Sequence, residues 1–203
     1  RVFVGGKDVT KLKNYKRAKN IARVFQDPSL GTCPSMTIFE NMSIADNKLK
    51  PYNLTSGLNH KRKDFYRSQL ELLGLGLEDR MDTKTRTLSG GQRQALALIM
   101  ATMVKPDILL LDEHTAALDP KTAAKVLELS DKFIAEEGLT AMMVTHNMRD
   151  AIAHGNRLIM MNNGKIILDV SGEEKKKLTV EYLLEAFSKL SGEEFANDRA
   201  LLN

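Results

Sequence analysis

A short, uninterrupted apolar run followed by acids restricts the folds available to this chain. Ile108–Asp112 has the sequence ILLLD and follows Lys105-Pro106-Asp107, which stops a helix. A strand that is apolar throughout is typical of a central parallel strand covered on both faces. Leu139–His146 (LTAMMVTH) predicts a second buried strand of this kind. Because helical patterns separate and surround these runs, the sequence predicts an α/β fold with a parallel sheet.

The remaining elements follow from apolar spacing, caps and turns. Strand patterns occupy Arg1–Val4 and Ile21–Phe25, and Asn162-Asn163-Gly164 is the turn of a predicted hairpin. Helical patterns occupy Thr37–Met42, 60–77, Ser89–Val104, Pro120–Glu136, Asn147–Ala153 and Thr179–Leu190. In 60–77 the expected buried positions are Phe65, Leu70, Leu72, Leu73 and Leu75.

These elements divide into two lobes and a tail. Residues 1–35 and 105–175 supply the strands of an α/β lobe, and 36–104 form a smaller, mostly helical lobe. Segment 46–59 is polar and contains Pro51 and Gly57, so we expect a loop there. Residues 176–203 are expected to form a C-terminal helix and a loosely packed polar tail.

Composition excludes some classes of protein. The single cysteine, Cys33, allows no internal disulfide, which fits the reducing cytoplasm. No apolar run approaches the roughly 20 residues that span a bilayer, and no signal peptide opens the chain. A net charge of +4 is compatible with an anionic ligand, but such a surplus usually has no specific meaning. The basic run at 60–63 is better explained as a solvated helix start.

The sequence LSGGQ at 88–92 predicts an anion-binding helix start. Ser89 can cap the helix, with Gln92 three residues on, and Gly90 and Gly91 leave backbone amides uncovered. Unpaired amides and the helix dipole both favour negative charge at such an end. An ordinary capped helix is the alternative, although this pentapeptide is expected by chance in only about one in several thousand chains of this length.

Polar residues after three strands indicate a site at one sheet edge. Asp112 and Glu113 end one strand, His146 ends the next, and Gln26 follows the strand at 21–25. Ligands of open α/β sheets bind at the carboxyl ends of the strands. Asp112 can orient Mg²⁺ and Glu113 can accept a proton from water. A solvated strand end, or a histidine that is merely hydrogen-bonded, is the simpler explanation for each residue alone.

The order of these motifs resembles the ABC ATPase family over essentially the whole chain. VFQDP at 24–28 precedes LSGGQ at 88–92, ILLLDE at 108–113, ALD at 117–119 and TH at 145–146. The resemblance implies a P-loop NTPase-like parallel sheet with a helical subdomain, and it implies ATP and Mg²⁺ as ligands. It assigns Gln26 to the Q-loop, Leu88–Gln92 to the signature motif and Ile108–Asp112 to Walker B.

The same resemblance supplies further roles and partners. It makes Glu113 the catalytic glutamate, Asp119 part of the D-loop and His146 the switch histidine. Two such subunits pair head to tail, so Ser89 and Gly91 would contact the nucleotide of the partner. The residues that flank the motifs resemble those of a bacterial importer branch. In that branch the ATPase lies on the cytoplasmic face of the plasma membrane with a permease and a substrate-binding lipoprotein. His114 is a marker of this branch. No nucleic acid is expected as a partner.

One part of the family pattern is absent from residues 1–203. The phosphate loop G-x-x-x-x-G-K-[ST] has no counterpart, because Gly5-Gly6-Lys7 lacks its spacing. The resemblance places this loop ahead of Gln26, so we expect an N-terminally truncated ATPase that binds ATP weakly by itself. Two alternatives stay open: a soluble ABC ATPase of repair or translation, and a non-catalytic module that docks on a permease.

Overall fold

The computed structural model describes residues 1–50, 54 and 56–188 of the chain. It contains two compact units, Arg1–Val144 and Thr145–Asn203. The predicted division into an α/β lobe, a helical lobe and a tail stays a prediction. The expected polar tail after Gly192 lies outside the described residues, and so does part of the loop predicted at 46–59.

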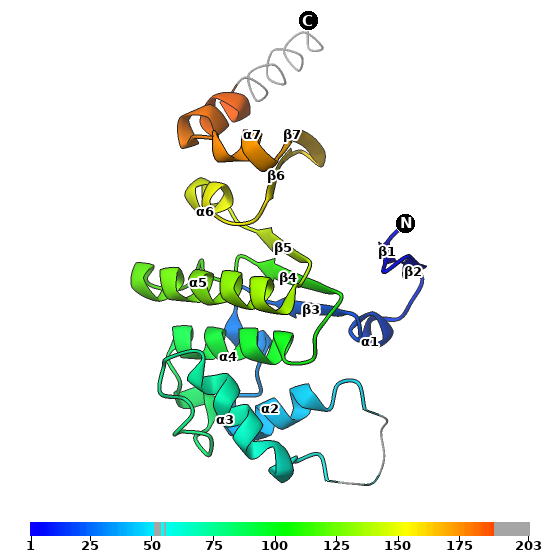
Figure 1. Ribbon diagram of the computed structural model, residues 1–203, viewed down its shortest axis with the longest axis vertical. Coiled ribbons are helices and arrows are strands. Elements are labelled where there is room, and N and C mark those ends of the chain that lie inside the picture. The colour runs from blue at the N-terminus through cyan, green and yellow to red at the C-terminus, as the bar shows by residue number, and fades with distance from the viewer. Residues whose placement is uncertain (51–53, 55, 189–203) are drawn as a thin grey trace, which may run out of the picture. The chain divides into compact units, whose positions relative to one another are not determined.

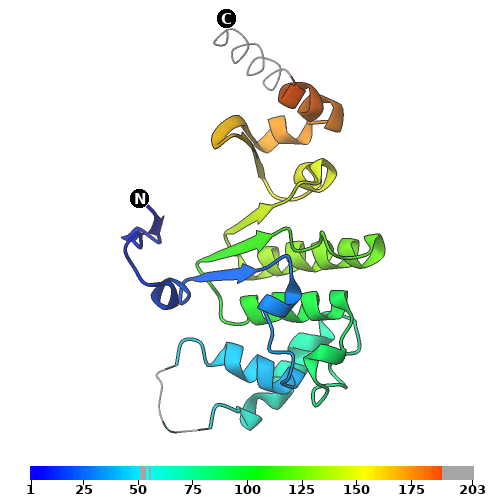
Figure 2. The ribbon, with the colours of Figure 1, turned by 180° about the vertical axis from the view of Figure 1, so that it is seen from behind.

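A parallel sheet forms the centre of the first unit. It has the order β3-β4-β5, with β3 at Ile21–Val24, β4 at Ile108–Asp112 and β5 at Ala141–Val144. Both neighbouring pairs are parallel, and Figure 2 shows the three arrows pointing the same way. The predicted strands and their parallel arrangement are therefore confirmed.

The sheet has one well-covered face among the described residues. Leu109 and Leu111 of β4 are buried, whereas the alternate residues of that strand are only partly buried. In β5, Met142 and Val144 are about half exposed, at 54% and 51%. The prediction that both strands are buried on both faces is therefore wrong for this unit, because its helices lie against one face (Figure 2) and β5 is at the sheet's edge.

Two helices supply most of that cover. α4, Gly90–Thr102, packs against β3 and α5, and α5 spans Pro120–Glu137 (Figure 1). α4 ends two residues before the predicted Val104. α5 has proline at its first position, and it ends at Gly138, whose left-handed φ of 59° suits a residue without a side chain.

Two α-helices and three short 3-10 turns are described between β3 and α4. α2 spans Ile38–Asp46 and begins with a capping box, in which Glu40 N donates to Thr37 Oγ1 and Thr37 N donates to the Glu40 carboxylate. α3 spans Lys63–Glu71, and short 3-10 turns lie at Pro28–Leu30, His60–Arg62 and Thr85–Thr87.

The predicted buried positions around α3 need one correction. Leu70 and Leu73 are fully buried and Phe65 and Leu75 are partly buried, but Leu72 is 39% exposed. Tyr66 takes an inner position instead, because its hydroxyl donates to Asp46 Oδ2 at 3.0 Å while its ring packs against Phe39. A tyrosine is readily buried where its hydroxyl finds such a partner.

The N-terminal residues form a small hairpin followed by a helical turn. β1 at Phe3–Val4 pairs antiparallel with β2 at Lys7–Asp8 around a turn at Gly5-Gly6. α1, Asn14–Arg17, then leads into β3.

The second unit contains the predicted hairpin. β6, Arg157–Asn162, pairs antiparallel with β7, Lys165–Ser171, and the pairing shifts register between Met160 and Met161. α6 spans Met148–Ala153, α7 spans Gly172–Lys176, and residues 180–188 are helical, which agrees with the described part of the predicted helix at 179–190.

Candidate functional site

The register of the sheet brings three predicted residues to one edge. Val24 pairs with Leu111 and Asp112 pairs with Val144, so the carboxyl ends of β3, β4 and β5 coincide. Asp112 ends β4 and Glu113 follows it. Gln26 comes two residues after the end of β3 and is exposed. Polar groups therefore gather where the parallel strands end.

Asp112 forms an ion pair with a neighbouring arginine. Its Oδ2 accepts a hydrogen bond from Arg23 Nη2 of the adjacent strand, and the Arg23 guanidinium lies 4.6 Å from the centre of the Phe25 ring. The two side chains are 38% and 49% exposed, so the pair adds little to stability. Any cation that binds Asp112 must share or displace this arginine.

Glu113 has an unusual backbone conformation. Its φ is 43°, in the left-handed region that costs a non-glycine residue about 1–3 kcal/mol. Two backbone hydrogen bonds fix it there: Glu113 N donates to Val144 O at 2.9 Å, and Ala116 N donates to Glu113 O at 3.0 Å. Such strain is typical of sites where a side chain must be presented in one direction.

The LSGGQ segment begins α4 with the predicted capping box. Gln92 N donates to Ser89 Oγ at 3.2 Å, and Ser89 N donates to Gln92 Oε1 at 3.1 Å. Leu88 is buried, whereas Gly90 is exposed. Gly91 is buried against α5: a Cβ placed on it would lie 1.9 Å from Thr122 Cγ2. Close packing against Thr122 therefore favours glycine at position 91.

Asp119 links this region to the start of α5. Its side chain accepts a hydrogen bond from Thr122 N at 3.1 Å, and the hydrogen bonds from Thr122 lower the pKa of the Asp119 carboxyl. Leu118, one residue earlier, lies near Gly90, since a Cβ there would be 3.6 Å from Leu118 Cδ2. The residues predicted for the signature motif and the D-loop therefore lie side by side.

Gln94 is a residue that the sequence analysis missed. It is fully buried in α4, and its Nε2 donates to Phe25 O at 3.0 Å, directly before Gln26. The only signal in the sequence is an amide residue at the start of the apolar part of α4. Its partner lies 69 positions away, so sequence pattern alone could not have identified the contact.

His146 belongs to the second unit, where it is exposed directly before the N-cap of α6. Asn147 supplies that cap, accepting from Arg149 N at 3.0 Å. The role predicted for His146 at the sheet edge stays a prediction.

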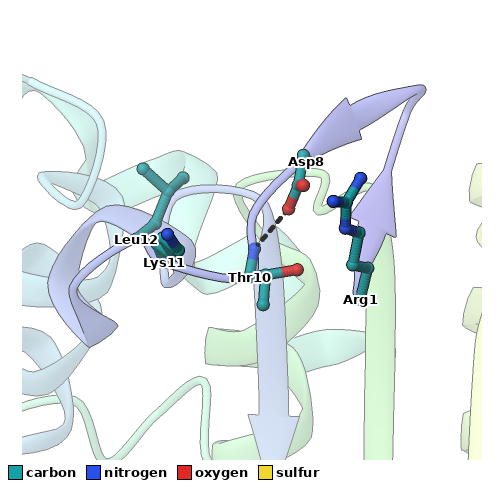
Figure 3. A pocket seen from close by; sticks show the side chains of 5 residues that line it. All are labelled: Arg1, Asp8, Thr10, Lys11 and Leu12. Carbon is teal, nitrogen blue, oxygen red and sulfur yellow. Dashed lines mark hydrogen bonds between the residues drawn. The ribbon is translucent and has the colours of Figure 1, made fainter.

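A shallow hollow beside the N-terminal hairpin does not involve these residues. It is lined by Arg1, Asp8, Thr10, Lys11 and Leu12, and Thr10 N donates to Asp8 Oδ1 at 2.9 Å (Figure 3). None of the predicted site residues lines it, so the candidate site is the sheet edge with the neighbouring start of α4.

Comparison with known proteins decides the family. A family model described as ABC transporter matches residues 1–116. A tyrosine transport ATP-binding protein of Clostridioides difficile is 53% identical over 179 residues, which cover 88% of this chain and 71% of the relative. The chain belongs to the ABC transporter family, as an ATP-binding subunit.

Other ABC relatives and structures agree. The methionine import ATP-binding protein MetN 1 of Oceanobacillus iheyensis is 35% identical over 192 residues, and the match spans 90% of this chain but only 54% of MetN 1. The ATP-binding cassette MJ0796, solved as a dimer with ADP and Pi, is 29% identical with a TM-score of 0.67 over 83% of this chain and 72% of the cassette. MJ1267, an ABC cassette in its ADP conformation, is 26% identical with a TM-score of 0.69 over 89% and 73%. The predicted ABC-type α/β fold is confirmed.

The site suits a hydrated Mg²⁺ better than a closed metal cage. In the part of the chain that the structure describes, no cluster of three or more His, Cys, Asp or Glu side chains is arranged to hold a metal ion. Mg²⁺ usually keeps several waters and takes one or two carboxylates together with phosphate oxygens. Asp112 is half-buried and offers one carboxylate, so it fits that pattern. Among the described helices, none is long and apolar enough to cross a membrane.

Proposed function

We propose that this ABC subunit hydrolyses ATP to power the import of a solute through a partner permease. The observation that supports it best is the strand register that sets Gln26, Asp112 and Glu113 on one edge. The proposed site is completed by a second ATPase subunit in head-to-tail contact. The MJ0796 cassette, a dimer with ADP and Pi, supports both the pairing and the reaction.

Each site residue receives a role in this proposal. Glu113 accepts a proton from a water molecule as the water oxygen bonds to the γ-phosphorus and the bond to the bridging oxygen breaks. Gln26 orients that water on the same subunit, and resemblance to the family assigns His146 the role of the switch histidine. Preorganised polar groups of this kind act mainly by stabilising the charge that develops on the phosphoryl oxygens.

The signature motif acts on the other nucleotide of the dimer. Leu88–Gln92 forms the start of α4, where Ser89 and Gly91 face the γ-phosphate bound by the partner, and Asp119 bridges the two sites. Asp112 and Gln26 would hold Mg²⁺ together with phosphate oxygens, and the ion would supply neutralising charge.

The solute class follows from the relatives by analogy. Their names specify tyrosine transport and methionine import, and we infer that the solute here is an amino acid. The permease and a substrate-binding protein would select it, and docking on the permease would place this subunit at the cytoplasmic face of the membrane. The subunit itself would contribute the energy of ATP hydrolysis.

The test compares two forms of the chain. One is residues 1–203, and the other, called the extended chain, carries an added segment with the G-x-x-x-x-G-K-[ST] phosphate loop ahead of Arg1. Because residues 1–203 contain no G-x-x-x-x-G-K-[ST] sequence, we expect calorimetry to show little Mg-ATP binding by them. We expect the extended chain to bind and hydrolyse ATP.

Glu113→Gln in the extended chain tests the chemistry. Turnover should fall at least a hundredfold while ATP binding persists, because the amide cannot accept the proton. Glu128→Gln, an exposed change on α5, is the matched control and should keep turnover within about twofold. Wild-type turnover by Glu113→Gln would refute the proposed role, and tight ATP binding by residues 1–203 would refute the dependence on the added loop.

A further inference from the structure

His114 directly follows the strained Glu113 in sequence. Its side chain is buried and is hydrogen-bonded to α5. His114 and Ser130 are each only 2% exposed. The Nε2 of His114 lies 3.0 Å from the Oγ of Ser130. Burial of both groups excludes competing water, so this hydrogen bond fixes their separation more firmly than a surface contact would.

The direction of this hydrogen bond follows from the serine. Ser130 Oγ donates its one hydrogen to Val126 O at 2.8 Å within α5. It can therefore only accept from His114, so the imidazole carries its proton on Nε2. Ser130 Oγ on α5 is thus the hydrogen-bond acceptor for His114.

The contacts around Glu113 show what this hydrogen bond adds. The Glu113 amide is fixed to β5 through Val144, and its carbonyl is fixed by Ala116 within the turn. Neither contact sets how the turn lies against α5. His114 does so, since it reaches from the turn to Ser130, more than two helical turns from the start of α5 at Pro120.

We propose that His114 is a positioning residue that orients the Glu113 carboxylate by anchoring the following turn to Ser130. This rests on the proposed function, in which Glu113 is the base. The φ of 43° at Glu113 means that relaxation toward an ordinary backbone conformation is downhill once an anchor is lost. A shift of about 1 Å in a catalytic group can lower a rate by up to about a hundredfold.

A purely structural role for the pair predicts a different pattern. Loss of a buried hydrogen bond would then lower the thermal midpoint, while each folded molecule would keep its normal turnover. Measuring kcat per folded molecule therefore distinguishes a positioning role from a purely structural role.

The experiment measures ATP turnover of the extended chain with four substitutions. For His114→Ala and Ser130→Ala we expect kcat per folded molecule to fall about tenfold or more, with KM for ATP changed less than about twofold. His114→Gln keeps an N–H donor near Ser130 and should recover most of the rate. Ser68→Ala, an exposed serine on α3, is the control and should have no effect. Unchanged kcat with only a lower thermal midpoint would overturn the proposal.

A double variant separates this proposal from the assignment of Glu113. If His114 acts through Glu113, adding His114→Ala to Glu113→Gln should lower the residual rate no further, and a further tenfold loss would overturn the proposal. If Glu113→Gln alone keeps turnover, the proposed function itself fails. If Glu113→Gln abolishes turnover but His114→Ala does not lower it, only the role of His114 fails.

A spectroscopic measurement is independent of ATPase activity. In ¹⁵N-labelled residues 1–203, the His114 imidazole should be the Nε2–H tautomer with a slowly exchanging proton, and Ser130→Ala should make that exchange faster. An Nδ1–H tautomer in the unsubstituted protein would contradict the anchor on which the proposal depends.

Discussion

Replacing Gly91 with alanine gives a sharp test of the packing between α4 and α5. The added Cβ would lie 1.9 Å from Thr122 Cγ2 and 3.3 Å from Thr122 Cβ. Carbon atoms normally approach to about 3.5–4.0 Å, so the two helix starts must separate or Thr122 must turn. Overpacking of this kind typically costs about 1–3 kcal/mol, and the better helix propensity of alanine offsets at most about 1 kcal/mol.

The net expectation is a loss of about 1–2 kcal/mol in the free energy of unfolding for Gly91→Ala. Thr122→Ser removes the methyl group that clashes, leaving 3.3 Å to Cβ as the nearest contact. The double variant Gly91→Ala/Thr122→Ser should therefore recover most of the lost stability. Urea unfolding of residues 1–203, with the slope of the transition unchanged, measures both effects.

Two outcomes would refute this reasoning. If Gly91→Ala is as stable as the parent, Thr122 turns to its other helical rotamer at no cost. If the double variant is no more stable than Gly91→Ala, the clash lies elsewhere. In the extended chain, a double variant that folds normally yet hydrolyses ATP slowly would show that Gly91 also has a role at the nucleotide.

Two further predictions concern stability. Gly138→Ala should cost about 1 kcal/mol in chemical unfolding, because φ of 59° is strained for alanine although no atom would clash, and Gly57→Ala, without a positive φ, is the control. Burial alone would raise the pKa of Asp46, but hydrogen bonds from Lys50 and Tyr66 outweigh it, so the pKa is lower than 3.8. Asp46 therefore stabilises the fold at neutral pH, and this contribution disappears as the pH falls through that lowered pKa. Asp46→Asn should be less stable at pH 7 and lose less stability below about pH 4 than the parent, as judged by thermal unfolding across pH. Asp64→Asn, at a fully exposed carboxylate, should leave that acid dependence unchanged.

Features that depend on neighbours in sequence could be predicted from the sequence. The capping boxes of α2 and α4 involve residues three apart, and the stop at Gly138 follows from its own backbone conformation. The hairpin turn at Asn163-Gly164 is similar, since both residues adopt positive φ. The strands were recognisable because an apolar run bounded by helix stops has few other uses.

Features that depend on tertiary contacts could not be predicted in this way. Leu72 and Tyr66 both fit a helical pattern, but Tyr66 is buried with its hydroxyl bonded to Asp46, whereas Leu72 is exposed. The exposure of Met142 has the same origin, since its strand is as apolar as β4 but lies at the edge of the sheet. Hydrophobicity indicates which residues can be buried, whereas position in the sheet decides which are.

The start of α4 is in contact with two other motif segments, which sequence spacing could not reveal. Gln94 is hydrogen-bonded to the backbone beside Gln26, and Gly91 is packed against Thr122, whose amide is bonded to Asp119. Because close-packed contacts have little room to yield, a displacement of α4 must either move these neighbours or break the contacts. Segments that appear as separate motifs along the chain therefore form one packed group in the first unit. A substitution at their contacts, such as Gly91→Ala, is thus expected to disturb more than the motif in which it lies.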